Sequence, residues 1–209
     1  MCNLYRMTKS PSEVAKWFEA MNDTLGANFA EELYPGYPGL VVAEGRLRPM
    51  NWGFPVVLKG KQGQPLKPKP VTNARDDKLT TGFWRDSFAK RRCLIPVTEW
   101  AEAEGEKGRM TRTWYRVAGH ELFAVAGLWR PTAEWGHAYS MVMADACSQM
   151  VEVHDRMPVI LTRDQWAGWL GGDEAEALAL ARTCDLELAM ERTGERWAGG
   201  PRPAERALL

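Results

Sequence analysis

The chain has 209 residues, and its 27 Lys and Arg residues balance its 27 Asp and Glu residues, so the formal net charge is zero. Apolar residues make up 45% of the chain, which excludes disorder as a description of the whole and suffices for a sizeable core. A nucleic-acid partner would have to be held by a local basic groove, because the overall charge offers no attraction. The ten tryptophans should mostly pack in the core, although one or two could stack on bases.

The four cysteines are far apart in the sequence: Cys2, Cys93, Cys147 and Cys184. They show no paired metal-ligand spacing, so we expect no zinc site, and the length of the chain argues against a disulfide framework. The chemistry predicted below needs no metal and no organic cofactor. The chain starts without the long apolar stretch of a signal peptide, and no run approaches membrane-spanning length. We therefore expect a cytoplasmic protein with reduced thiols and no membrane partner.

The first predicted elements are a short strand over residues 2–7 and a helix from about 11 to 22. The helix begins at a capping box, Ser10-Pro11-Ser12-Glu13, with proline at the first helical position. Its apolar residues recur at helical spacing: Val14, Trp17, Phe18 and Met21.

The pattern then changes to short β-rich runs that are separated by Gly, Pro and charged turns. Lys59–Pro70, with its lysines, glycines and prolines, is predicted to be an exposed loop, and Phe83–Arg91 a short helix. We expect strands over six runs: Leu40–Ala43, Trp52–Leu58, Cys93–Val97, Thr113–Val117, Leu122–Leu128 and Tyr139–Ala144.

The C-terminal part combines one strand, Val159–Leu161, with two helices. The first follows a second capping box at 162–165 and ends at the glycines 171–172, and the second covers Asp173–Cys184. There is no internal repeat and no linker. We expect one α+β domain over residues 1–198, built on a curved, mainly antiparallel, barrel-like sheet with a few flanking helices, and a loose tail over 199–209.

Cys2 is the first residue with a chemical interpretation, because a small residue after the initiator methionine permits removal of Met1. Cysteine would then carry a free α-amine, with an ordinary pKa of about 7.7–8.0, beside a thiol with a pKa of about 8.5. These two groups suit an aldehyde: the amine forms a Schiff base, and the sulfur closes a five-membered thiazolidine ring intramolecularly. Taken alone this is a weak indication, since many chains begin Met-Cys.

Three downstream segments strengthen it. They are Val71-Thr72-Asn73-Ala74-Arg75, preceded by Met50-Asn51-Trp52-Gly53-Phe54; Arg92-Cys93-Leu94-Ile95-Pro96, followed six residues past Pro96 by Glu102; and His154-Asp155-Arg156-Met157-Pro158-Val159-Ile160-Leu161. With Cys2, in residue type and in order, they resemble the SOS-response-associated peptidase (SRAP) family. The resemblance runs from Cys2 to about Leu170.

The resemblance implies a function. Members of that family crosslink covalently to abasic sites in single-stranded DNA through the N-terminal cysteine, as a thiazolidine. They were first proposed to be peptidases that remove their own N-terminal segment. Carried over by motif, the family's roles fall on seven residues: Cys2 as nucleophile, Asn73 as its positioning partner, Glu102 as proton-transfer acid/base, His154 as a second acid/base, Arg75 and Arg156 as phosphate ligands, and Trp52 as a base-stacking surface.

The chain also departs from the family pattern. Many relatives continue Cys-Gly-Arg, whereas this chain has Cys2-Asn3-Leu4, and the glutamate lies in Trp100-Ala101-Glu102-Ala103 without the usual aromatic pair. Glu99 is an alternative for the acid, although the distance from Pro96 favours Glu102. These changes affect the expected shape of the DNA groove more than the chemistry.

Each of these residues also has an ordinary structural interpretation. A glutamate on a strand is usually a solvated charge, and a histidine such as His154 usually lies at the surface or is satisfied by hydrogen bonds. The Asn73 amide could equally hold the Cys2 backbone. The two arginines could pair with neighbouring carboxylates, those of Asp76, Asp77 or Asp155.

We therefore predict a monomeric enzyme that binds single-stranded DNA and captures abasic-site aldehydes, associating with the nucleoid when DNA is damaged. The second hypothesis is an N-terminal-nucleophile cysteine peptidase with His154 as base. The third is a non-covalent DNA-binding module whose Cys2 is inert. Denaturing gels with abasic and intact oligonucleotides separate the three, because only the first predicts an abasic-specific adduct that resists denaturation.

Overall fold

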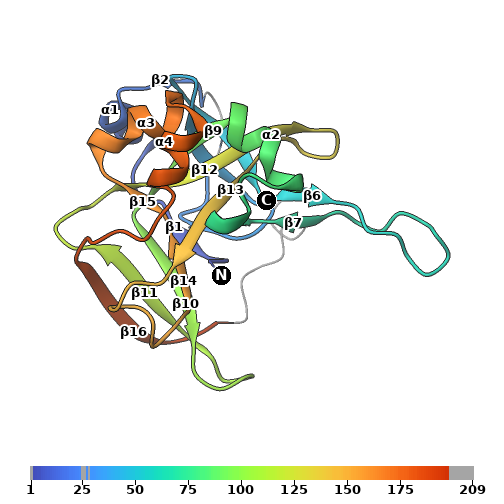
Figure 1. Cartoon of the computed structure of the whole chain (residues 1–209). Coiled ribbons are helices and arrows are strands. Elements are labelled where there is room, and N and C mark those ends of the chain that lie inside the picture. The colour runs from blue at the N-terminus through green and yellow to red at the C-terminus, as the bar shows by residue number, and fades with distance from the viewer. Residues whose placement is uncertain (1, 25–26, 28, 198–209) are drawn as a thin grey trace.

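The computed structural model describes residues 2–24, 27 and 29–197 (Figure 1). Its helices are α1 Pro11–Phe18, α2 Gly82–Lys90, α3 Trp166–Gly171 and α4 Glu174–Leu180, with 3-10 turns at Asp76–Lys78 and Arg163–Gln165. Its strands are β1 Tyr5–Arg6, β2 Met21–Asn22, β3 Glu32–Leu33, β4 Pro38–Ala43, β5 Arg46–Trp52, β6 Phe54–Val56, β7 Lys69–Val71, β8 Asn73–Arg75, β9 Arg92–Val97, β10 Glu99–Glu104, β11 Thr111–Val117, β12 Phe123–Thr132, β13 Gly136–Asp145, β14 Arg156–Pro158, β15 Ile160–Leu161 and β16 Leu188–Arg196.

Five strands close into a barrel at the centre of the fold. β13, β12, β9, β4 and β5 follow one another as antiparallel neighbours, and β5 then pairs in parallel with β13. Ring closure leaves no free edge along these pairings. The expected α+β domain with a curved, mainly antiparallel, barrel-like sheet is confirmed.

A second sheet of five strands brings the N-terminal strand to the barrel, in the order β16-β11-β10-β1-β3. Tyr5 of β1 lies opposite Trp100 of β10, and both side chains are completely buried in the main core. The Tyr5 ring meets the edge of Trp52 on β5, and its hydroxyl bonds that of Tyr139 on β13. The second sheet therefore packs where β5 and β13 close the barrel.

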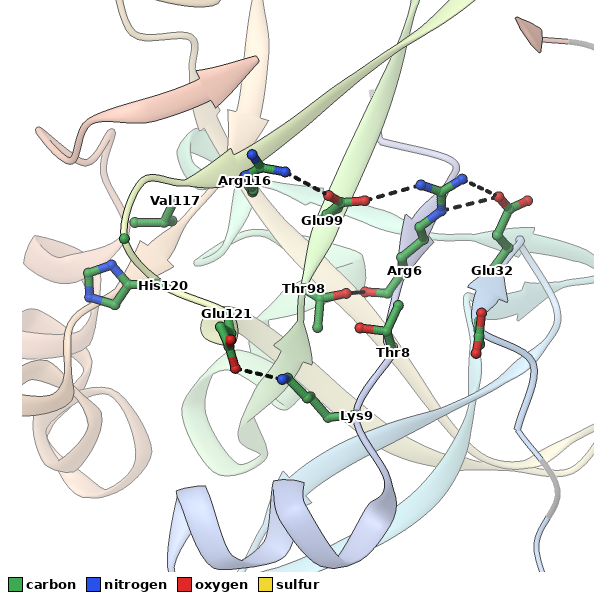
Figure 2. Close-up of a pocket in the computed structure, with 12 residues that line it drawn as sticks. Arg6, Thr8, Lys9, Glu32, Thr98, Glu99, Arg116, Val117, His120 and Glu121 are labelled. Atoms are coloured by element: carbon green, nitrogen blue, oxygen red, sulfur yellow. Dashed lines mark hydrogen bonds and ion pairs between the residues drawn. The ribbon is translucent and has the colours of Figure 1, made fainter. Parts of the chain in front are cut away.

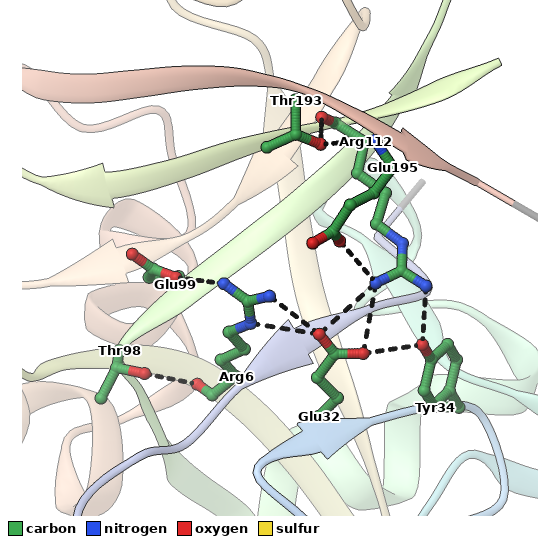
Figure 3. Close-up of polar contacts among 8 residues, drawn as sticks. All are labelled: Arg6, Glu32, Tyr34, Thr98, Glu99, Arg112, Thr193 and Glu195. Atoms are coloured by element: carbon green, nitrogen blue, oxygen red, sulfur yellow. Dashed lines mark hydrogen bonds and ion pairs between the residues drawn. The ribbon is translucent and has the colours of Figure 1, made fainter. Parts of the chain in front are cut away.

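The outer face of this sheet carries a network of charges around Arg6. Its guanidinium binds Glu32 of β3 and Glu99 of β10 (Figure 2). It also lies 3.7 Å from the centre of the Trp114 ring. Glu32 also accepts from Arg112 of β11 (Figure 3). Single exposed ion pairs contribute little, but this network joins strands that are remote in sequence.

The first helix is shorter than predicted. It starts at the expected capping box, with both reciprocal bonds formed, but ends at Phe18 because Glu19 adopts a left-handed conformation with φ of 54°. Met21 then lies in β2, where it pairs with Arg46 of β5 and is 59% exposed. Its apolar spacing matched a helix, but pairing with β5 takes precedence. The last helix likewise stops at Leu180, before Cys184.

The strand predictions locate half of the sixteen strands in the described residues, namely β1, β4, β6, β9, β11, β12, β13 and β15. Trp52–Leu58 is broken at Gly53, whose φ of 112° ends β5 and lets β6 begin in a new direction. The predicted exposed loop ends in a strand, β7, which pairs with β6. Local patterns do not predict β10 or β16, because both strands are rich in charged residues.

Two further expectations concern the ends and the environment of the chain. The predicted tail over 199–209 lies outside the described residues. Among the helices that the structure describes, none combines the length and the apolar character needed to cross a membrane.

We predict that Gly39→Ala destabilises the fold. A Cβ on Gly39 would overlap the hydroxyl oxygens of Tyr139 and Tyr5, so the buried pair would have to move. Overpacking of this kind costs about 1–3 kcal/mol, measured as a lower free energy of unfolding in urea. The control is Gly171→Ala, where a Cβ meets nothing within 4 Å. Equal stability of Gly39→Ala and wild type would contradict the prediction, and Tyr139→Phe should partly rescue it.

Candidate active site

Cys2 is completely buried beside the start of β1. The backbone N–H of Ala101 donates to the Leu4 carbonyl at 3.0 Å, so the N-terminal segment runs along β10 past the end of the regular ladder. The Cys2 thiol donates to the same carbonyl at 3.5 Å. Burial, reinforced by the charge of Glu102, raises the pKa of this thiol far above its usual range. In the chain that still carries Met1, the thiol is therefore protonated and a weak nucleophile.

Asn73 and Thr72 hold the backbone at Cys2. The Asn73 amide donates to the Cys2 carbonyl and to the Thr72 hydroxyl, both at 2.8 Å, and the hydroxyl donates to Asn3 Oδ1 at 3.3 Å. Asn73 itself is placed by β8, which pairs in parallel with β13 at Met141. The amide therefore does hold the Cys2 backbone, as its ordinary interpretation proposed. Its second partner, Thr72, was not among the predicted site residues.

Glu102 lies on β10 facing the core, opposite Thr113 of β11, and is 1% exposed. Burial raises the pKa of its carboxyl to about 8, so it is mostly protonated at neutral pH. The alternative acid, Glu99, points to the other face of the sheet and pairs there with Arg6 and Arg116 (Figure 2). Alternation along the strand thus separates the two glutamates, and only Glu102 is near Cys2.

His154 lies in the segment before β14, with Nε2 at 3.9 Å from Glu102 Oε2. His154 Nδ1 lies 2.9 Å from the backbone nitrogen of Arg156 and 3.1 Å from both the Arg156 carbonyl oxygen and Asp155 Oδ1, so each tautomer of the neutral ring has a partner at this nitrogen. Burial lowers the pKa of His154, which keeps the ring neutral at neutral pH. Burial thus raises the pKa of the Glu102 carboxyl and lowers that of the His154 imidazole, a combination that is typical of acid–base pairs in active sites.

The two arginines flank one strand of the barrel. Arg75 on β8 and Arg156 on β14 lie on opposite sides of β13. Arg75 is exposed and makes a two-bond pair with Asp77, at 2.9 and 3.0 Å. Arg156 pairs with carboxylates at 3.1 and 3.2 Å, those of Asp76 and Asp145. A phosphate could replace such partners at low cost only where the pair is exposed, as at Arg75.

Trp52 requires a correction. Its side chain is 0% exposed, and its indole N–H donates to the Thr72 carbonyl at 3.2 Å. No face of the ring is open to a base, because Trp52 belongs to the barrel wall against Tyr5. Trp52 thus supports the backbone at Thr72, 20 residues further along the chain, and does not stack on a base.

A pocket lies away from this site. It has a volume of about 700 Å³ and opens on the outer side of β1 and β10 (Figure 2). Its lining includes none of the four residues predicted to be catalytic, and its cations are paired with its carboxylates, as in Lys9 with Glu121.

Among the described residues, no group of three or more His, Cys, Asp or Glu side chains could hold a metal ion.

Fold and site together define an α+β barrel protein whose second residue, a cysteine, is buried beside a glutamic acid and a histidine. The chain belongs to the SOS response associated peptidase (SRAP) family, whose model matches residues 1–194. The family assignment made from the motifs is confirmed.

Two curated relatives come from Bacillus subtilis (strain 168). "Abasic site processing protein YobE" is 30% identical over 135 residues, or 60% of this chain and 58% of that protein. "Abasic site processing protein YoaM" is 28% identical over 138 residues, or 60% of this chain and 56% of that protein. The matches thus span less than two thirds of the relatives' own length.

Solved structures share the fold. A crystal structure of a protein from Bacteroides thetaiotaomicron superposes with a TM-score of 0.77 at 20% identity, covering 91% of both chains. One from Bordetella bronchiseptica gives 0.76 at 21% identity, covering 92% of this chain and 99% of that one.

The raised pKa of Glu102 predicts a pH-dependent stability. Between the unfolded value of 4.5 and the folded value of about 8, the folded state holds a proton that the unfolded state has lost. The contribution of Glu102 to the free energy of unfolding is therefore most favourable below pH 4.5. It falls as pH rises toward 8, by at most about 1.4 kcal/mol per pH unit. Glu102→Gln should remove this slope in urea unfolding curves recorded across that range, with the state of Met1 read from intact mass. Parallel pH profiles for the two proteins would contradict the assignment.

Proposed function

We propose that this protein processes abasic sites in single-stranded DNA by forming a covalent bond between the lesion and Cys2, after Met1 is removed. The observation that supports this most directly is the juxtaposition of Cys2, Glu102 and His154 in a buried site. Membership of the family and the names of its Bacillus relatives support the same substrate.

The chemistry needs one proton donor and one acceptor. The Cys2 α-amine adds to the sugar aldehyde, and the resulting carbinolamine loses water when its hydroxyl is protonated, which a neutral Glu102 carboxyl can do. The Cys2 sulfur then bonds to the imine carbon while the thiol proton passes to the nitrogen. One water leaves and nothing is oxidised or reduced, so this sequence of steps needs no cofactor.

The remaining site residues have positioning and binding roles in this proposal. Asn73 holds the Cys2 carbonyl, which orients the amine and the thiol. Arg75 and Arg156 bind phosphates on the two sides of the lesion, and Arg75 is the more accessible of the two. A single strand suits the site because its aldehyde is reached without opening a duplex.

A peptidase is the second candidate, favoured by the description of the family and by the neutral imidazole of His154. In that mechanism Cys2 attacks a peptide carbonyl and His154 is the base. Only the crosslinking function yields an adduct that is specific to abasic strands and resists denaturation.

We predict that Cys2 alone among the cysteines is required for the adduct. Cys2→Ala should abolish the adduct with an abasic oligonucleotide on denaturing gels, because alanine keeps the α-amine but lacks the sulfur that closes the ring, which leaves only a hydrolysable Schiff base. Cys93, buried in the core, and the half-buried Cys147 and Cys184 serve as controls, and their alanine variants should crosslink if they fold. Efficient crosslinking by protein that retains Met1, identified by intact mass, would overturn the thiazolidine mechanism.

A further prediction separates formation from release. Glu102→Gln should slow adduct formation by about 10²–10⁴-fold, the usual contribution of a general acid. His154→Ala should slow formation less but should slow release, because reopening the ring requires a proton at the leaving sulfur or amine.

Release is measured by a chase: the protein is loaded on a labelled abasic strand, excess unlabelled strand is added, and the labelled adduct is followed on denaturing gels. His120→Ala, at an exposed histidine in the outer pocket, is the matched control. An unchanged release rate for folded His154→Ala would reduce His154 to an orienting residue.

A further inference from the structure

One exposed hairpin concentrates positive charge in a chain whose net charge is zero. It runs from Phe54 to Val71, comprises β6, β7 and the turn between them, and is called the lysine hairpin below. No Asp or Glu occurs anywhere from Phe54 to Arg75. The hairpin contains Lys59, Lys61, Lys67 and Lys69, and all four are exposed.

These lysines differ from the other cations around the site. Arg75 and Arg156 are paired with carboxylates, and so is Lys78 just after them. Among the described residues, none of the four hairpin lysines makes an ion pair. Their charge is therefore available to an anionic partner without the loss of an existing pair.

The hairpin is an ordered arm and is held away from the body (Figure 1). Phe54 pairs with Val71 at its base, and the Leu66 N–H donates to the Leu58 carbonyl at 2.8 Å beyond the ladder. At the base, Phe54 packs against Trp84 with ring centroids 5.4 Å apart, and the Arg130 guanidinium lies 4.0 Å from the centre of the Phe54 ring. These contacts fix the direction in which the arm leaves the barrel.

The arm also exposes apolar side chains. Val57, Leu58 and Leu66 are 42%, 47% and 42% exposed, although residues of this kind are usually buried. Lysines interleaved with exposed aliphatic groups fit nucleic acid, because phosphates meet the ammonium groups while bases contact the apolar surface. An acidic protein would use the same charge, and the test below distinguishes it.

The position of the arm selects the partner. β7 continues directly into Thr72 and Asn73, the residues that hold Cys2, and the Val71 carbonyl is anchored by the Ser140 hydroxyl at 2.6 Å. When the lesion of a bound DNA strand lies at Cys2, the part of the strand that flanks the lesion on one side therefore passes the base of the hairpin. Gly63 at the turn precedes Asn73 by ten residues, so the tip reaches at most about 33 Å from it, the length of about ten stacked nucleotides.

We propose that the lysine hairpin is a second DNA-binding element, which holds the strand that flanks the lesion on one side. The inference rests on the proposed function of the Cys2 site and adds to it a contact outside that site. In this proposal the hairpin determines the affinity for DNA and how that affinity depends on strand length, whereas Cys2, Glu102 and His154 carry out the chemistry.

The test uses the full chain with all four hairpin lysines changed to glutamine and compares two intact single strands. The short strand covers only the Cys2 site, and the long strand extends past the reach of the arm on either side. The variant should bind the long strand at least about tenfold more weakly than wild type, and its slope of log affinity against log salt should fall by about 2–3, because each phosphate contact on a single strand contributes about 0.7. Affinity for the short strand should not change.

A matched variant removes four exposed cations from other parts of the surface, none of which makes an ion pair within the described residues: Lys16→Gln, Lys107→Gln, Arg109→Gln and Arg182→Gln. It should bind the long strand as wild type does, which shows that location and not net charge matters. Abasic adduct formation on the short strand, at saturation, should be equal in wild type and in the hairpin variant.

The outcomes separate the two proposals. If wild type crosslinks abasic DNA but the hairpin variant binds the long strand like wild type at every salt concentration, the hairpin is not a DNA element, and a protein partner becomes the alternative. If the hairpin variant loses affinity while wild type forms no adduct, the proposed function fails and the hairpin contact stands.

Discussion

The pairing of β1 with β10 is the interaction on which the candidate site depends. The regular ladder is only two residues long, and the bond from the Ala101 N–H to the Leu4 carbonyl extends it toward the N-terminus. Glu102 follows Ala101 on β10, so the register of this pairing decides which carboxyl lies beside Cys2. A shift of one residue would exchange Glu102 for a side chain of the outer face.

So short a ladder needs support from side chains, and both faces of β1 provide it. On the outer face, Arg6 binds Glu32 and Glu99 and stacks on Trp114. On the inner face, Tyr5 bonds Tyr139 and packs on Trp52. The barrel thus acts on the site through the N-terminal strand, and the absence of a side chain at Gly39 leaves room for the tyrosine pair.

Burial then determines the state of the reactive groups. It raises the pKa of the Cys2 thiol and of the Glu102 carboxyl and lowers that of His154, so all three are mainly neutral near pH 7. Condensing an aminothiol with an aldehyde moves protons without requiring a permanent charge, which suits such a site. In the proposed function, the cations that bind DNA lie outside this site, on Arg75 and on the lysine hairpin, where water screens the charges and partners can exchange.

Much of this could be read from the sequence, where a signal is local. The capping box at Ser10 needs only a few adjacent residues, and the start of α1 was predicted correctly, as were the fold class and the family. The sequence also identified Cys2, Asn73, Glu102 and His154, which the structure brings together from four separate segments.

The tertiary structure alone decided the rest. It placed Trp52 in the barrel wall, because a tryptophan beside a conspicuous motif has the same sequence signature whether it is buried or exposed. It separated Glu102 from Glu99 by strand alternation, which requires knowing that β10 is a strand although its sequence is highly charged. Above all, the register between β1 and β10 joins residues almost a hundred positions apart, and no local pattern encodes such a pairing, because it is determined by the packing of both strands against the barrel.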